Sequence, residues 1–118
     1  MAGGLSIHVV DVSRGVVAAG MRVEVYAATA SRSLICAGEI NAKGVLDNAT
    51  LMSDAIGAGY YEAVFHVAGY YRHAGVPLPS QPFLDVVTYR FGISDVAYHY
   101  HLPMKFTPWG YSCFRGGA

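Results

Sequence analysis

The sequence predicts an all-β sandwich of about eight strands with one short helix. Short segments in which apolar and polar residues alternate recur along the chain, and Gly, Asn, Asp or Pro separates them. In residues 5–12, LSIHVVDV, the aliphatic Leu5, Ile7 and Val9 fall on one face, as in a half-buried strand. With 118 residues the chain can build one hydrophobic core, so we expect a single domain over residues 1–118.

The other elements are predicted in chain order from the same alternation. We expect further strands at residues 21–27, 33–40, a short segment after the turn NAKG (41–44), 60–67, 83–93, 97–104 and 111–114. Residues 13–20 are predicted to be a turn-rich connection. Residues 68–74 break the alternation and predict a short helix that Gly75 ends.

The charge composition argues against a nucleic-acid partner and favours association with further copies of the chain. Eight basic residues face eight acidic ones, with no basic cluster to follow a nucleic-acid backbone. Only 14% of residues are charged, against about 25% in an average protein, whereas 53% are hydrophobic. So few charges cannot cover a monomer, and we expect a homo-oligomer that buries apolar surface between copies.

Two features favour a cytoplasmic protein that does not associate with membranes. No apolar run approaches the roughly 20 residues that span a bilayer, and the N-terminal residues lack the pattern of a secretion signal. We expect Cys36 and Cys113 to be free thiols, as is usual in a reducing compartment.

Histidines are the strongest candidates for chemistry. On a strand His99 and His101 project to one side, and His8 occupies the polar face of its own strand. Three such imidazoles are consistent with half-exposed surface residues, with a zinc site, or with a general base. Spacing alone does not decide between these interpretations. His66 and His73 flank the predicted helix and are interpreted as structural or solvated.

Several other chemistries find weak support. There is no Gly-x-Ser-x-Gly elbow, and Ser112 falls within a predicted strand. No Gly-rich phosphate loop precedes a helix, and we expect no cofactor. The carboxylates that a glycosidase would need are scattered along the chain at Asp11, Asp47, Asp54 and Asp85.

Both ends of the chain resemble one family, the transthyretin-related 5-hydroxyisourate hydrolases. The similarity lies in LSIHVVDVSRGVVAAGMRVEVY at the start and HYHLPMKFTPWGYSCFRGGA at the end, with GYYEAVFHVAGYY and PFLDVVTYRFGI between them. The resemblance implies an eight-stranded sandwich with one short helix, assembled as a homotetramer with active sites at the dimer–dimer interface. It also implies hydrolysis of a ring lactam in the product of urate oxidation, which yields a ureidoimidazoline.

The family's site residues are partly retained. The resemblance places its first-strand histidine at His8, its His-Tyr-His motif at residues 99–101 and its tail arginine at Arg115. The mid-chain arginine of the family falls on Val45. The tail reads Phe114-Arg115-Gly116-Gly117, so the family's tyrosine and terminal serine hydroxyls are missing.

The valine suggests a methylated substrate. Replacing arginine by valine removes up to five donors and one charge, whereas an N-methyl group removes a ring donor and gains from an apolar wall. We therefore predict hydrolysis of an N-methylated 5-hydroxyisourate, such as the 1,3,7-trimethyl form expected from caffeine and other methylxanthines. The alternatives are an ordinary 5-hydroxyisourate hydrolase in which Lys43 or water replaces the arginine, and a non-catalytic transthyretin-like binding protein.

The expected roles complete the prediction. One of His8 and His101 acts as general base while the other orients the attacking water, and Arg115 stabilises the oxyanion. The residues expected to bind substrate are His99, Val45, Ser112, Phe114 and Gly117. Any zinc on His8, His99 and His101 would be incidental and inhibitory, because it would occupy the nitrogens that a base needs.

Overall fold

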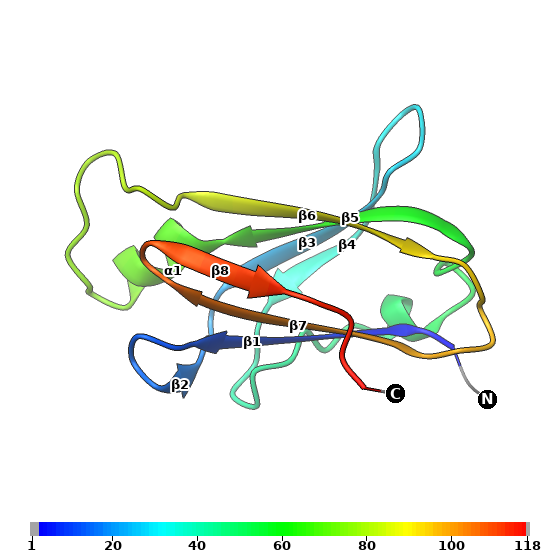
Figure 1. The fold of residues 1–118 in the computed structure, drawn as a ribbon, viewed down its shortest axis with the longest axis horizontal. Helices are drawn as coiled ribbons and strands as arrows, with labels where there is room; N and C mark the ends of the chain where they lie inside the picture. The colour runs from blue at the N-terminus through cyan, green and yellow to red at the C-terminus, as the bar shows by residue number, and fades with distance from the viewer. Residues whose placement is uncertain (1–2, 118) are drawn as a thin grey trace.

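Two four-stranded sheets pack face to face in the computed structural model, which describes residues 3–117 (Figure 1). The first sheet has the order β2 (Val16–Val17), β1 (Leu5–Asp11), β7 (Tyr100–Thr107) and β8 (Gly110–Cys113). The second has the order β4 (Ser33–Glu39), β3 (Arg22–Ala27), β5 (Gly59–His66) and β6 (Val86–Ile93). The predicted all-β sandwich is confirmed, as is the predicted short α-helix, α1 (Val67–His73).

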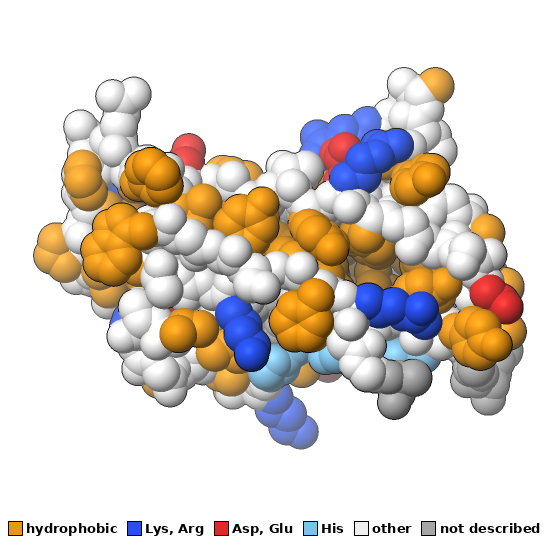
Figure 2. All heavy atoms as spheres, viewed as in Figure 1, with side chains coloured by type: hydrophobic (Ala, Val, Ile, Leu, Met, Phe, Trp, Pro, Cys, Tyr) orange, Lys and Arg blue, Asp and Glu red, His pale blue; other side chains and the backbone are white. Residues whose placement is uncertain are grey.

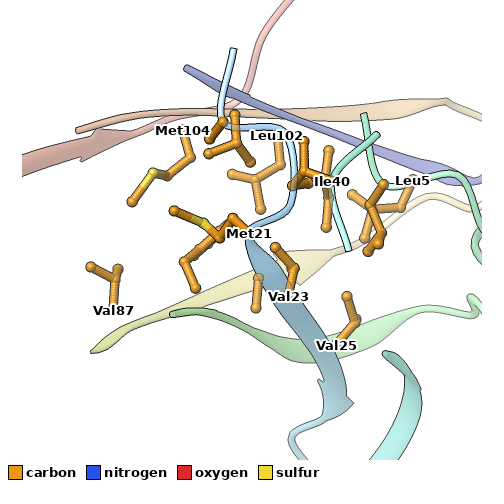
Figure 3. Packing of buried hydrophobic residues seen from close by; sticks show 14 of the residues in the cluster. Leu5, Met21, Val23, Val25, Ile40, Val87, Leu102 and Met104 are labelled. Atoms are coloured by element: carbon orange, nitrogen blue, oxygen red, sulfur yellow. The ribbon is translucent and has the colours of Figure 1, made fainter. Parts of the chain in front are cut away.

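The core fills the space between the sheets. Leu5 and Met104 from the first sheet meet Val23 and Val87 from the second, with Met21 between them (Figure 3). All five side chains are at most 2% exposed. The alternation in β1 is as predicted, because its odd-numbered residues are buried and its even-numbered residues are half-buried on the outer face.

A buried carboxylate joins the end of β1 to the helix. Asp11 is fully buried, and its Oδ1 accepts hydrogen bonds from the Tyr71 hydroxyl at 2.7 Å and the Ser13 hydroxyl at 2.7 Å. The Tyr70 hydroxyl donates to Oδ2 at 3.1 Å. These bonds hold α1 against the first sheet and compensate for the loss of water around the carboxylate.

Two strand predictions need correction, although the strand number is right. Residues 13–20 contain β2, a two-residue strand that pairs with the end of β1, where only a connection was expected. The predicted strand after NAKG is an isolated bridge between Val45 and His8. Whether such short segments form strands depends on the strands that pair with them. Alternation within so few residues does not identify these partners. A short 3-10 helix, η1 (Ala49–Met52), was not predicted.

Strand boundaries also shift near the predicted site. The strand expected at 97–104 is β7, which starts at Tyr100, so His99 lies just before the strand. The strand expected at 83–93 starts at Val86, after the prolines of its approach. No helix within residues 3–117 is long and apolar enough to cross a membrane.

Candidate active site

The outer face of the first sheet carries the histidine cluster. β1 and β7 run parallel, and their register pairs Ser6 with His101 and His8 with Pro103. Side chains paired in this way emerge on the same face, here the face turned away from the core. Ser6, His8, His99 and His101 are all half-buried. In Figure 2 the histidines form a row along the lower part of the molecule, between Lys and Arg side chains.

Ser6 links the two histidines of the His-Tyr-His motif. Its Oγ lies 2.6 Å from His101 Nδ1 and 2.8 Å from His99 Nε2. His99 Nδ1 lies 2.9 Å from the carbonyl oxygen of Gly3. A continuous chain of hydrogen bonds therefore runs from the backbone at Gly3 to the ring of His101.

The turn at residues 41–45 positions His8. The His8 Nε2 lies 3.2 Å from the carbonyl oxygen of Lys43, and the ring rests against Gly44. A Cβ at position 44 would lie 2.8 Å from His8 Nε2 and 2.8 Å from a methyl carbon of Val17, and Gly44 has a φ of +84°. Only glycine satisfies both the close contact and the backbone conformation.

Val45 contributes an apolar wall beside His8. The two residues form an antiparallel bridge, so their side chains project to the same side with Cβ atoms about 5 Å apart. The Asn41 side chain fixes the turn, since its Oδ1 accepts hydrogen bonds from the backbone N–H groups of Lys43 and Val45. The side chain at position 45 therefore has a defined place next to the first histidine.

The C-terminal tail runs on from the end of β8 and stays against β7 (Figure 1). The backbone N–H of Gly116 donates to the carbonyl oxygen of His101 at 2.7 Å, and a Cβ on Gly116 would come within 2.7 Å of the His101 ring. The Arg115 guanidinium lies 4.0 Å from the centre of the Tyr100 ring. A cavity of about 60 Å³ lies between the tail and the edge of the core, and its lining includes His101, Arg115 and the inward-facing Tyr100. The tail backbone therefore lies against His101, but the Arg115 guanidinium stacks on Tyr100, whose buried side chain points to the opposite face of β7 from His101.

Two predicted substrate-binding residues lie farther away within one chain. Ser112 pairs with Lys105 on the same outer face, four residues along β7 from His101, which is about 13 Å. Gly117 follows Gly116 in the exposed tail. His66 belongs to the other sheet, where its Nε2 lies 3.1 Å from Glu24, and His73 is exposed in the last turn of α1.

Burial and the neighbouring imidazoles lower the pKa of His101. The pKa of His101 is lowered from its ordinary value of 6.5, first by burial and then by the charges of His8 and His99. His101 is therefore neutral at neutral pH and has a lone pair available as a base. The two cysteines are free, and burial raises the pKa of Cys113 to about 12 and also raises that of Cys36, so neither thiol is activated.

The zinc interpretation finds no support in the geometry. Within residues 3–117 no three His, Cys, Asp or Glu side chains are grouped so as to hold a metal ion. His99 engages both ring nitrogens, one with Gly3 and one with Ser6. A ring in that state has no free lone pair for a metal.

Sequence reasoning missed Ser6. A serine on a strand face is common and carries no signal by itself. The available hint was its position two residues before His8, which places both side chains on one face. Ser6 contacts the motif only because the β1–β7 register brings it next to His101, which is 95 positions away in the sequence.

Solved structures share this architecture. A 5-hydroxyisourate hydrolase from Klebsiella pneumoniae superposes with a TM-score of 0.79 at 26% identity, covering 99% of this chain and 100% of that one. An (S)-allantoin synthase superposes with a TM-score of 0.86 at 31% identity, over 98% of this chain and 44% of that one. Sea bream transthyretin in complex with thyroxine, at 24% identity and a TM-score of 0.84, shares the fold.

Sequence relatives narrow the class. The chain is 40% identical to 5-hydroxyisourate hydrolase 2 of Rhizobium meliloti over 115 residues, which are 97% of this chain and 96% of that protein. It is 41% identical to the 5-hydroxyisourate hydrolase of Deinococcus radiodurans over 114 residues, 96% of this chain and 95% of that protein. Fold, histidine cluster and relatives together define a hydrolase built on a transthyretin-like sandwich. The chain belongs to the HIUase/Transthyretin family, whose sequence profile matches residues 5–116.

Proposed function

We propose that this chain hydrolyses the ring lactam of a 5-hydroxyisourate. The observation that carries the proposal is the neutral, half-buried His101, whose ring is held by Ser6 beside a second imidazole, His8. Relatives at 40% and 41% identity are named 5-hydroxyisourate hydrolases, and they align with almost the whole chain. A hormone-carrier function has no comparable support, because the similarity to transthyretin at 24% identity concerns the fold alone.

The proposed reaction needs a base, an oriented water and an oxyanion partner. His101 takes a proton from water as the water oxygen bonds to the lactam carbonyl carbon, and His8 orients that water. The Arg115 guanidinium, which stacks on Tyr100 in the single chain, is proposed to turn to the negative oxygen that develops and stabilise it. The C–N bond then breaks, and the imidazolium of His101 returns the proton to the leaving nitrogen. Water has then been added across the bond, and the histidine is neutral again.

We propose that copies of the chain assemble as a homotetramer and complete the site at the dimer–dimer interface. The cavity beside His101 measures about 60 Å³, whereas sites for small molecules usually measure about 300–1,000 Å³. Trp109, Tyr111 and Phe114, in and around β8, are 42% to 71% exposed, so the chain alone leaves apolar surface uncovered. Light scattering coupled to gel filtration should give four times the chain mass of 12.6 kDa. A monomer would contradict the assembly.

We propose that the preferred substrate is N-methylated. The support is Val45, whose side chain stands beside His8 where the family resemblance places an arginine. Each methyl group buried against such a wall contributes about 0.8 kcal/mol. Ordinary 5-hydroxyisourate is the competing substrate, and it is the one in the names of the relatives.

The test of hydrolysis is direct. Freshly generated 5-hydroxyisourate and its trimethyl analogue each decay spontaneously, and ultraviolet absorbance follows the decay. Purified protein should accelerate at least one of the two decays in proportion to its concentration. No acceleration of either would overturn the proposed function.

A cytoplasmic location is part of the proposal. Cys36 and Cys113 are free and lie in different sheets, as suits a reducing compartment. Recovery of the native protein in the cytoplasmic fraction of its host would support this location, and recovery outside it would contradict it.

A further inference from the structure

We propose that Ser6 and His99 are positioning residues that fix the tautomer of His101, with the proton on Nδ1 and the lone pair on Nε2 available to the reaction. The catalytic role of this tautomer rests on the proposed hydrolysis. The tautomer itself follows from the hydrogen bonds of this chain alone.

The chain of hydrogen bonds begins at a group that can only accept. The carbonyl oxygen of Gly3 has no proton, so His99 Nδ1, 2.9 Å away, must be the donor. A neutral imidazole carries one N–H, and in His99 this proton is now assigned to Nδ1. The other nitrogen, His99 Nε2, is therefore an acceptor.

Ser6 transmits this polarity to His101. Its hydroxyl has one proton, which goes to His99 Nε2 at 2.8 Å. Its oxygen, with that proton committed, accepts from His101 Nδ1 at 2.6 Å. Neutral His101 therefore carries its proton on Nδ1, and its Nε2 is the nitrogen that can take a proton from water.

The same hydrogen bond also favours the charged state that catalysis creates. When His101 Nε2 takes the proton, Nδ1–H still donates to the Ser6 oxygen, now as a charge-assisted hydrogen bond. The titratable neighbours of the His101 ring are His8 from β1 and His99 from the approach to β7, and the tail backbone at Gly116 lies against it. None of these gives His101 Nδ1 a hydrogen-bond partner; Ser6 does.

Nitrogen-15 NMR of imidazole-labelled protein tests the tautomer without substrate. In the wild type at neutral pH, we expect His101 to show a protonated Nδ1 and a bare Nε2. Ser6→Ala should shift the population toward Nε2–H. Ser6→Thr, which keeps the hydroxyl, should retain the wild-type pattern. A wild-type His101 protonated on Nε2 would overturn the proposal.

Kinetics test the catalytic consequence. Ser6→Ala should lower kcat between about 10- and 100-fold and change KM by less than about threefold, because the hydrogen bond strengthens as His101 becomes charged. Ser6→Thr should recover most of the rate. The matched control is Ser33→Ala, since Ser33 is exposed on β4 of the other sheet and should leave both constants unchanged. An unchanged kcat in Ser6→Ala would contradict the positioning role.

The two readouts separate this inference from the proposed function. If the wild type hydrolyses neither 5-hydroxyisourate but its His101 spectrum shows Nδ1–H lost in Ser6→Ala, the relay stands and the substrate assignment fails. If the wild type is active but the spectrum or the rate does not respond to Ser6→Ala, the hydrolase stands and the relay fails. Circular dichroism and light scattering on each variant exclude unfolding or loss of assembly as the cause.

Discussion

Val45 pairs with His8 as an isolated antiparallel bridge, so an aliphatic side chain lies next to a histidine of the proposed site. Because of this pairing, the replacement of the family's arginine by valine changes the surroundings of the His8 imidazole. The position that the family resemblance assigns to an arginine projects on the same side as His8, and we propose that its side chain influences which substrate binds.

Val45→Arg should shift substrate preference toward the unmethylated 5-hydroxyisourate. The guanidinium restores donors for polar ring groups and removes the apolar wall, and a partner regained or lost by a buried polar group changes kcat/KM by about tenfold. The measurement is the ratio of kcat/KM for the two substrates. Val45→Leu keeps the wall apolar and should leave this ratio within about threefold of the wild type. An unchanged ratio in Val45→Arg would show that position 45 does not contact the ring.

His101→Asn should reduce hydrolysis by at least about 100-fold, because a general base contributes roughly that much and an amide cannot replace it. Gel filtration and circular dichroism should be unchanged. His73→Asn is the control, since His73 is exposed at the end of α1, and it should retain full activity. A fully active His101→Asn would remove the base assignment.

The pH dependence of kcat/KM should reflect the lowered pKa of His101. The base works in its neutral form, and burial together with His8 and His99 disfavours its protonation. Activity should therefore persist as the pH falls to 6.5, the ordinary histidine value, and decline below it. An acidic limb centred above 6.5 would mean that the titrating group is another one.

Arg115→Ala should lower kcat by about 100-fold, as expected for loss of an oxyanion donor. Arg115→Lys keeps the charge but not the planar fork and should recover part of the rate. The exposed Arg72 on α1 provides the control, and Arg72→Ala should leave kcat and KM unchanged. If Arg115→Ala raises KM alone, the arginine binds substrate without stabilising the transition state.

Asp11→Ala should destabilise the fold by about 2–4 kcal/mol, because the hydroxyl groups of Tyr70, Tyr71 and Ser13 lose their shared acceptor. Urea denaturation measures the change. Asp54→Ala, at an exposed residue, should alter the free energy of unfolding by less than about 0.5 kcal/mol. A comparable loss in both variants would show that the buried network adds no stability.

The sequence was most informative where a pattern extends over many residues. Alternation in residues 5–12 identified β1 and its buried face, and the break at residues 68–74 together with Gly75 located α1 to within one residue at each end. Two-residue β2 and the single bridge at Val45 exist only through partners on β1, and no local pattern encodes them.

In the candidate site, too, local pattern predicted the faces of residues but not their contacts across strands. The faces of His8 and His101 follow from strand period, but the contact of Ser6 with His99 and His101 requires the parallel β1–β7 register. The contact of Gly116 with His101 continues the antiparallel β7–β8 register, in which Met104 pairs with Cys113, and residue types alone do not determine that register.

The central claim is that this chain uses His101 to hydrolyse a 5-hydroxyisourate. The most direct measurement follows the decay of 5-hydroxyisourate and of its trimethyl analogue in parallel, with wild type, with His101→Asn and with buffer alone. We predict faster decay with the wild type, greatest for the trimethyl compound, and decay at the buffer rate with His101→Asn. Equal rates in all three samples for both compounds would contradict the claim.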